Sequence, residues 1–271
     1  MMCEGIQIGI IGGGAMAEAL IGGLVHSEVV PPSHISVSDH KAMRCDALAQ
    51  RYGVHAQVGA ESFLPRIDVL ILAVKPAAAA AAMQETAQLL KKGALVLSIV
   101  AGLTIAEIEA VYPAHPVIRA MPNTPLAVGA GMSAYACGVH AEAPMSAVAE
   151  RILGAAGRAV LVHEGDLDAV TGLSGSGPAY AFLMMEALIE GGVAAGLRRE
   201  TATALAAQTL LGAAQMVLTA KSSPADLRAA VTSPAGTTAA GLRVIERAGV
   251  RSALIEAVLA ATARSGELGR R

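Results

Sequence analysis

The feature that most constrains this chain is a run of three glycines between a short aliphatic segment and a helical one. Ile6–Ile11 is predicted to be a β-strand, and Ala15–His26 is predicted to be the helix that follows it. Gly12, Gly14 and Ala17 occupy the three small-residue places of the G-x-G-x-x-G/A fingerprint. In a strand–turn–helix setting this fingerprint is typical of the first βαβ unit of a dinucleotide-binding sheet.

Each small residue of this loop has a physical reason to be small. Gly12 permits the tight turn, Gly14 lets the backbone approach a pyrophosphate, and Ala17 lets the helix pack against the strand. The free N–H groups at the helix start carry a partial positive charge that favours phosphate. The alternative is a plain tight turn without a ligand. We expect the loop to bind a dinucleotide through five residues: Gly12, Gly14, Ala15, Met16 and Ala17.

Residues 1–163 alternate short apolar runs with helical stretches, which is the pattern of a Rossmann-type doubly wound parallel sheet in an α/β fold. Asp68–Val74 is the clearest strand, because a parallel strand buried on both faces is an almost continuous apolar run. The other strands are expected at Ile6–Ile11, His34–Ser38, Ala94–Ile99, Val117–Met121, Gly131–Cys137 and Arg158–Val162. The helices are expected at Ala15–His26, Lys41–Tyr52, Ala77–Leu90 and Ala143–Leu153.

Residues 164–271 differ in character from the first part. They contain no His and a single Lys, Lys221, and they are rich in Ala and Leu. Alanine favours helix at little entropic cost, and Ser223-Pro224-Ala225-Asp226 has the residues of a capped helix start. Apolar helices of this kind need a cover, so we predict an all-α dimerisation domain that begins near Glu164. Its helices are expected at Asp166–Ala195, Glu200–Thr219, Pro224–Val231, Thr238–Ala248 and Val250–Arg264.

The end of the second predicted strand bears on the choice of dinucleotide. Asp39 is placed to hold the hydroxyls of an adenine ribose, which favours NAD. Ser38, His40, Lys41 and Arg44 are placed to bind a 2′-phosphate, which favours NADP. The alternative for Lys41 and Arg44 is that they are ordinary exposed charges at the start of a helix, without a ligand. We therefore expect Ser38, Asp39 and His40 to bind NADPH or NADH, with the preference left open.

Charge and cysteine content exclude several classes of function. The chain has 20 Lys and Arg against 22 Asp and Glu, which argues against nucleic-acid binding through a basic excess. Cys3, Cys45 and Cys137 lie far apart without C-x-x-C spacing, so no metal and a reduced, cytoplasmic location are expected. The N-terminus lacks the basic segment of a signal peptide. The apolar runs are expected to be interrupted before the roughly 18 residues that a membrane span needs.

The predicted helical domain lacks the base that an alcohol dehydrogenase requires. Such an enzyme needs a His or Lys to take the hydroxyl proton, and in 3-hydroxyacid dehydrogenases a Lys follows a Gly-rich stretch of this domain. No Lys follows Gly172–Tyr180 here. An imine removes the demand, because its nitrogen can arrive protonated and hydride transfer then completes the reduction. Lys75 and His115 keep a 3-hydroxyacid dehydrogenase as an alternative, and a non-catalytic dinucleotide-binding regulator is a second one.

Three further clusters are unusual for a plain scaffold. Ala73–Pro76 and Met121–Pro125 end predicted strands, where ligands bind in open α/β sheets. Ser233–Thr238 interrupts the helical tail, and its hydroxyls and the N–H groups of a new helix start together suit a carboxylate. The alternative for this last cluster is a capped turn between two helices.

Taken together, these stretches resemble those of the pyrroline-5-carboxylate reductases over nearly the whole chain. The last of the matching stretches is the signature region of that family. The resemblance implies reduction of 1-pyrroline-5-carboxylate to L-proline, the last step of proline biosynthesis, with NADPH or NADH. It also implies a swapped helical dimer and its assembly into a decamer of five dimers. The matching stretches are Gly9–Ala17, Ala73–Pro76, Met121–Pro125, Ser174–Tyr180 and Asp226–Gly241.

The resemblance also implies roles for single residues of these clusters. Ser233, Gly236 and Thr237 would bind the substrate carboxylate, with Val231 beside them. Thr238 would hydrogen-bond the ring nitrogen and is the candidate catalytic residue. The nicotinamide would lie near the ends of the two strands that the clusters follow. The further cofactor-binding residues expected there are Ala73, Val74, Lys75, Pro76 and Asn123.

Overall fold

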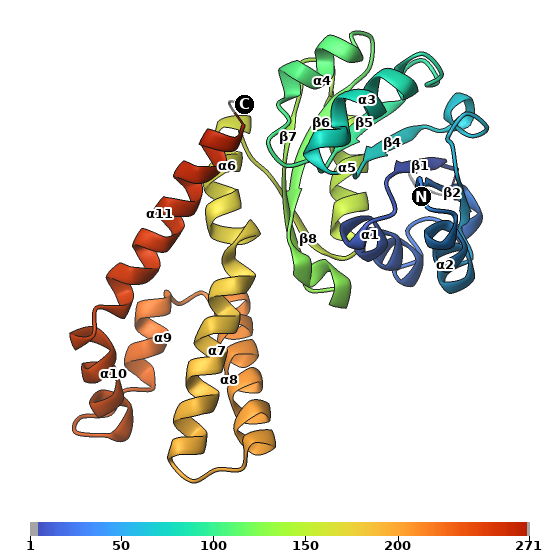
Figure 1. Ribbon diagram of the computed structural model, residues 1–271. Coiled ribbons are helices and arrows are strands. Elements are labelled where there is room, and N and C mark those ends of the chain that lie inside the picture. Colours follow the sequence, from blue (N-terminus) through green and yellow to red (C-terminus); the bar gives the residue numbers. More distant parts are fainter. Residues whose placement is uncertain (1–4, 270–271) are drawn as a thin grey trace. The chain divides into compact units, whose positions relative to one another are not determined.

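The computed structural model describes residues 5–269 and divides into two units (Figure 1). The first unit contains the residues up to Ser176 together with those from Ala260 onward, and the second is Gly177–Leu259. The chain therefore leaves the first unit and returns to it. The expected domain boundary at residue 164 stays a prediction, and Cys3 lies outside the described residues.

The first unit is built on an eight-stranded sheet with the order β3-β2-β1-β4-β5-β6-β7-β8. From β3 to β6 all neighbouring strands run parallel, and the chain order reverses between β1 and β4. This is the strand order of a doubly wound Rossmann-type sheet, as predicted. The strands are β1 Ile8–Ile11, β2 Ile35–Ser38, β3 His55–Gln57, β4 Val69–Leu72, β5 Leu95–Ser98, β6 Val117–Pro122, β7 Gly131–Cys137 and β8 Gly157–Leu161.

The last two strands of the sheet are reversed. β7 pairs antiparallel with β6, with Ser133 opposite Pro122, and β8 then runs parallel to β7. The link from β6 to β7 contains only a 3₁₀ turn, Thr124–Val128. A parallel return needs a crossover of a dozen or more residues, so this short link makes the chain turn back beside β6. The sheet is therefore mostly rather than wholly parallel.

Helices cover both faces of the sheet. One buried apolar cluster joins α1, α2 and α5 to the sheet, and a second joins α3, α4 and α6 to it. All four residues of β4 are buried, with Ile71 in the first cluster and Leu72 in the second. These helices are α1 Ala15–His26, α2 Ala42–Tyr52, α3 Pro76–Ala87, α4 Ile105–Val111, α5 Ala143–Gly154 and α6 Leu167–Val170.

Two elements were not expected from the sequence. β3 has three residues, two of them the polar His55 and Gln57, so it lacks an apolar run. α4 begins with a capping box in which Thr104 accepts a hydrogen bond from the Glu107 N–H and the Glu107 side chain accepts one from Thr104. The T-x-x-E spacing of that box is a readable signal of a helix start.

The second unit is helical. Its elements are α7 Gly177–Ala194, α8 Arg199–Thr219, α9 Pro224–Ala230, α10 Thr237–Arg247 and α11 Val250–Leu268, whose last turns belong to the first unit. The predicted cap at Ser223 is confirmed, because its hydroxyl accepts from the Asp226 N–H and Asp226 accepts in return. The expected helix Asp166–Ala195 is interrupted by a π-helical turn at Thr171–Gly175, where the glycine-rich stretch lies.

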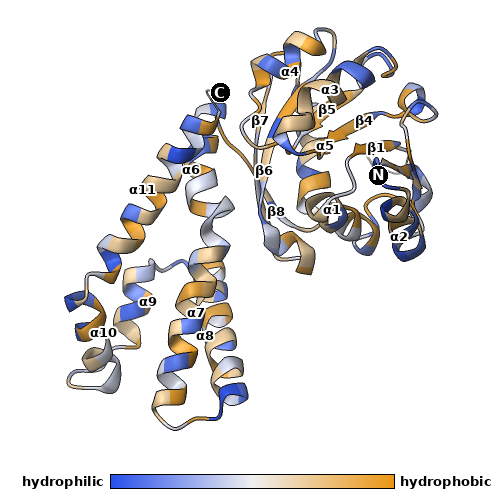
Figure 2. Cartoon of the chain, viewed as in Figure 1, coloured by the Kyte–Doolittle hydropathy of each residue, from blue (hydrophilic) through white to orange (hydrophobic). Residues whose placement is uncertain are grey.

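Large apolar side chains on these helices are exposed in the isolated chain. Figure 2 shows hydrophobic segments, in orange, along α7, α8 and α11. Leu183 on α7 is 67% exposed, and Leu218 on α8 is 63% exposed. Within the described residues, one helix, α8, is long and apolar enough to cross a membrane, judged by length and composition alone. The expectation that no apolar run reaches that length is therefore wrong for α8.

Candidate active site

Gly12 lies at the tightest point of the glycine loop. Its φ is 99°, and its N–H donates to the Ser38 carbonyl oxygen over 2.8 Å. A Cβ at this position would lie 2.6 Å from the carbonyl oxygen of Ala73. Both the backbone conformation and the space between β1, β2 and β4 therefore demand glycine.

Gly14 meets a different constraint. It is the N-cap of α1 in an extended conformation with φ −66°, and a Cβ there would find nothing within 4 Å. Ala17, in the third place of the fingerprint, is fully buried in the core. The first-turn N–H groups of α1 thus begin at an open position, while the helix itself packs closely on the sheet.

Gly13, between them, has its peptide groups held by two side chains. Its N–H donates to Asp39 Oδ2 over 2.8 Å, and its carbonyl oxygen accepts from Arg44 Nε. Asp39 Oδ1 accepts from the Lys41 N–H over 3.0 Å. Burial alone would raise the pKa of Asp39, but the backbone N–H groups of Lys41 and Gly13 hold that pKa below its usual value. Asp39 is therefore ionised at neutral pH.

A cavity of about 440 Å³ lies beside this loop, where the strand order reverses. It brings together the ends of β1, β2 and β4, and α3 forms its opposite wall. Ligands of open α/β sheets bind at such a reversal point. The sequence-predicted residues that line it are Gly12, Ser38, Asp39, His40 and Val74.

The other predicted cofactor residues lie at the ends of β4 and β6. Lys75 is the exposed N-cap of α3 and Pro76 is its first residue. Asn123 donates from Nδ2 to the Ser174 carbonyl oxygen over 3.2 Å, and its Oδ1 accepts from the Met132 N–H over 2.8 Å. The Asn123 amide thus ties the end of β6 to the π-helical turn and to β7.

A second cavity, of about 330 Å³, lies next to Pro76 and Met121 within the first unit. Arg119, which the sequence analysis did not single out, lines it and forms an ion pair with Glu164 at 3.0 Å. Glu164 also accepts from the Ile105 N–H over 2.7 Å, so this pair fastens the start of α4. Arg119 carried no local signal, because its partner lies 45 residues away.

The turn Ser233–Thr238 lies in the second unit between α9 and α10. Gly236 is the N-cap of α10, and its N–H donates to the Ser233 carbonyl oxygen. A Cβ on Gly236 would lie 2.4 Å from Ser233 Oγ, so a side chain at this position would require the Ser233 hydroxyl to rotate away. The side chains of Ser233, Thr237 and Thr238 are exposed. Exposed hydroxyls and the first N–H groups of α10 thus share one turn.

The turn contains a residue in a costly backbone conformation. Ala235 has a φ of 57°, in the left-handed region that favours glycine. Below the turn, Arg228 of α9 and Glu246 of α10 form an ion pair at 3.6 Å. The hydrogen bond from Arg251, and the charges of Arg251 and Arg228, lower the pKa of Glu246. The turn is therefore held between two linked helices.

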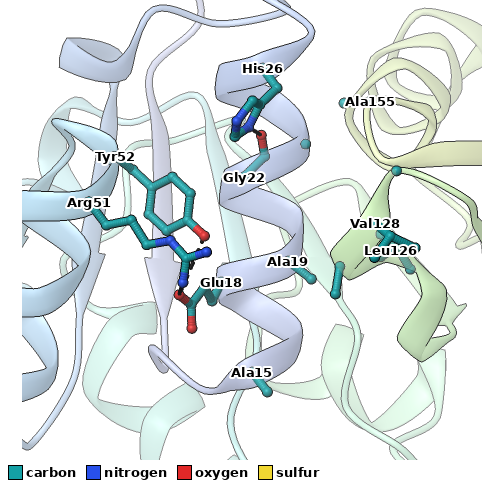
Figure 3. Close-up of a pocket in the computed structure, with 13 residues that line it drawn as sticks. Ala15, Glu18, Ala19, Gly22, His26, Arg51, Tyr52, Leu126, Val128 and Ala155 are labelled. Carbon is teal, nitrogen blue, oxygen red and sulfur yellow. Dashed lines mark hydrogen bonds and ion pairs between the residues drawn. The ribbon is translucent and has the colours of Figure 1, made fainter. Parts of the chain in front are cut away.

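A third cavity, of about 650 Å³, lies along α1, with α2 on one side and the 3₁₀ turn on the other (Figure 3). Ala15 is the single sequence-predicted site residue that lines it. Glu18 accepts there from Arg51 over 3.0 Å and from the Tyr52 hydroxyl over 3.4 Å. The cavity therefore adjoins the predicted site only at Ala15, and its Glu18 carboxylate is already paired with arginine side chains.

Two family models match the chain. The model described as pyrroline-5-carboxylate reductase dimerisation matches residues 164–268, and the one described as NADP oxidoreductase, coenzyme F420-dependent, matches residues 7–102. The chain is 46% identical over 98% of its length to the pyrroline-5-carboxylate reductase of Synechocystis, of which it covers 99%. The corresponding figures for the reductase of Arabidopsis thaliana are 42%, 98% and 96%.

The chain belongs to the pyrroline-5-carboxylate reductase family.

Solved structures of pyrroline-5-carboxylate reductases agree with this assignment. The Coxiella burnetii enzyme superposes with a TM-score of 0.91 at 37% identity, over 97% of this chain and 98% of that one. The Plasmodium falciparum enzyme, solved with NADP bound, gives 0.87 at 29% identity, over 98% and 99%. A 3-hydroxyisobutyrate dehydrogenase of Mycobacterium tuberculosis, 14% identical with a TM-score of 0.51 over 71% of this chain and 67% of that one, shares the fold alone.

Proposed function

We propose that this protein reduces 1-pyrroline-5-carboxylate to L-proline, the last step of proline biosynthesis, with NADPH or NADH. The observation that carries this proposal is the 46% identity to a reductase of that name across 98% of the chain. Because the match spans both halves, it includes the glycine loop and the hydroxyl-bearing turn together. A relationship limited to the sheet would support nucleotide binding alone.

The first unit fits a nicotinamide dinucleotide. Gly14 opens onto free space at the start of α1, where backbone N–H groups and the helix dipole favour a pyrophosphate. The adjoining cavity of about 440 Å³ has room for the adenosine half. The nicotinamide half would lie beside the residues at the ends of β4 and β6, namely Lys75, Pro76 and Asn123. When bound, the reduced nicotinamide would supply the hydride that the imine carbon accepts, which is C2 of 1-pyrroline-5-carboxylate and becomes C5 of the proline product.

The chain's own residues then have to bind and orient the substrate. Ser233, Thr237 and the N–H groups that follow Gly236 would hold the carboxylate, with Val231 beside them. Thr238 would hydrogen-bond the ring nitrogen. No strong base is required, because a protonated imine becomes the amine once hydride has arrived. We therefore attribute most of the rate to positioning and electrostatic preorganisation.

The helical unit supports self-association. The dimerisation model matches residues 164–268, and exposed leucines of α7 and α8 would be covered by a second copy. We propose a helical dimer, and its assembly as a decamer of five dimers. We place the enzyme in the cytoplasm, with α8 covered by protein rather than lipid. A net charge of −2 argues against nucleic acid as a partner.

The decisive experiment is an assay of the purified protein with 1-pyrroline-5-carboxylate, followed by the loss of NADPH or NADH absorbance at 340 nm. We expect turnover and L-proline as the product. In parallel, a 3-hydroxyacid with the oxidised cofactors should give none. Turnover of the hydroxyacid, or nucleotide binding without reduction of the imine, would contradict the proposal.

A further inference from the structure

Asp39 is placed where the acid of a dinucleotide-binding sheet usually selects the ribose, yet its carboxylate faces the protein. Oδ2 accepts from the Gly13 N–H over 2.8 Å, and Oδ1 accepts from the Lys41 N–H over 3.0 Å. The side chain is only 11% exposed. Both oxygens thus already hold the backbone of the glycine loop and of the start of α2.

Arg44 holds the carbonyl oxygen of the same glycine, Gly13. Its Nε donates to the Gly13 carbonyl oxygen, and its Nη2 donates to Glu18 Oε2 over 2.5 Å. The second carboxylate oxygen of Glu18 accepts from Arg51 and Tyr52 (Figure 3). Hydrogen bonding from Arg44 is the main reason that the pKa of Glu18 is lowered. A guanidinium held in this way is not free to turn towards a 2′-phosphate.

The two contacts together orient the backbone at the start of α1. In a planar trans peptide the carbonyl and the following N–H point in opposite directions. Because Arg44 holds the Gly13 carbonyl on the α2 side, the Gly14 N–H is directed away from α2. A Cβ on Gly13 would meet Leu48 at 3.0 Å, and Arg44 and Asp39 at 3.3 Å, so Gly13 packs closely against these side chains.

We propose that Asp39 and Arg44 are positioning residues that set the glycine loop for the dinucleotide pyrophosphate, and that neither selects between NADPH and NADH. The inference rests on the proposed function in one respect, that the ligand is a nicotinamide dinucleotide. Loss of either contact weakens both cofactors alike, because the pyrophosphate is common to them. The choice between them then falls to other groups near the ribose, among which His40 and Lys41 are exposed.

The test is direct titration of the full-length protein with NADH and with NADPH, followed by their fluorescence, without substrate. For Asp39→Asn we expect both dissociation constants to rise about ten-fold or more, as expected for a lost hydrogen bond to a charged group, with their ratio within about two-fold of wild type. At saturating cofactor, kcat should stay within about two-fold, because Asp39 touches the loop and no reacting atom. Asp46→Asn removes the same charge from an exposed position of α2 and serves as the matched control.

Arg44→Gln removes the contact with the Gly13 carbonyl oxygen and leaves Asp39 intact. It should weaken both cofactors in the same proportion, and circular dichroism melts establish that each variant is folded. If Asp39→Asn does not fold, Arg44→Gln carries the test. A loss of NADH affinity with NADPH unchanged or tighter would show ribose selection by Asp39, and a loss confined to NADPH in Arg44→Gln would show phosphate selection; either result, or unchanged affinities, overturns the inference. Wild-type protein that binds neither nucleotide would instead contradict the proposed function.

Discussion

At the scale of single residues, Gly12 and Gly14 are glycine for different reasons. Gly12 has a φ of 99° and faces the Ala73 carbonyl, so a side chain there collides with the fold itself. Gly14 has an ordinary φ of −66° and open space in place of a Cβ. The first glycine is required by the protein, and the second is required only by a ligand that approaches the loop.

Replacing Gly14 with Val should therefore abolish cofactor binding with little loss of stability. The new side chain occupies the space that a pyrophosphate needs, and a poor N-cap residue costs about 1 kcal/mol. Gly12→Ala is the comparison variant, for which we expect a loss of about 2–5 kcal/mol in the free energy of unfolding. Nucleotide titration and urea unfolding of both variants measure the difference. Unchanged nucleotide affinity in Gly14→Val would remove the loop from the site.

Substitutions of Thr238 and of Ser233 should change different kinetic constants. The carboxylate assigned to Ser233 is charged equally in the ground and transition states, so Ser233→Ala should chiefly raise the Michaelis constant for the substrate. The ring nitrogen assigned to Thr238 changes its hydrogen bonding as reduction proceeds, so Thr238→Ala should chiefly lower kcat. About 1.5–3 kcal/mol for each hydrogen bond corresponds to roughly ten- to a hundred-fold. Steady-state kinetics with both substrates varied test this, and values within about two-fold of wild type would return the turn to a structural role.

At the scale of elements, a buried tyrosine joins α4 to α3. The Tyr112 hydroxyl lies 2.6 Å from Thr86 Oγ1 and donates to the Met83 carbonyl oxygen over 3.2 Å. Burial raises the pKa of Tyr112 to about 12, against a smaller lowering by the hydrogen bond with Thr86. The folded protein therefore keeps the Tyr112 proton at a pH where the unfolded chain has lost it.

This raised pKa predicts a loss of stability at alkaline pH. The contribution is fully present below the unfolded pKa near 10, and it is lost as pH rises towards 12, by about 2–3 kcal/mol in all. At pH 7, Tyr112→Phe should be less stable than wild type by about 1 kcal/mol, through its lost hydrogen bonds. By pH 12 that difference should vanish or reverse. Urea unfolding of both proteins between pH 7 and 12 measures it, and parallel pH profiles would show that Tyr112 does not titrate in this way.

At the scale of the whole molecule, the helical unit has apolar surface that a single chain does not bury. Leu211 and Leu218 are seven residues apart on α8, hence on one helix face, and they are 51% and 63% exposed. Apolar surface of this extent is typical of an interface between subunits. The same observation explains why α8 has the length and hydropathy of a membrane span.

Charges placed on that face should weaken self-association. We expect wild-type protein to sediment as a dimer or a multiple of it, and Leu211→Glu with Leu218→Glu to shift it towards smaller species and to lower activity. Met43→Glu, at an 85% exposed apolar position of α2, is the control and should leave the assembly unchanged. A wild-type protein that is a fully active monomer in analytical ultracentrifugation would contradict the assignment of this surface.

The features that could be predicted from the sequence are those that neighbouring residues determine. The glycine fingerprint, the apolar run of β4 and the Ser223 cap each lie within a few residues, so their physics is local. The doubly wound, mostly parallel sheet followed from the alternation of strand and helix. The family resemblance likewise rested on short stretches such as Asp226–Gly241.

Only the tertiary structure determined the interactions between distant parts of the chain. The reversal of β7 depends on which strand it pairs with, and the three residues of β3 are a strand only because β2 lies beside them. Local sequence left the role of Arg44 open, because its partners Gly13 and Glu18 lie 31 and 26 positions away. Hydrogen bonds and strand pairing between such positions exist only once the chain has folded, so no local pattern encodes them.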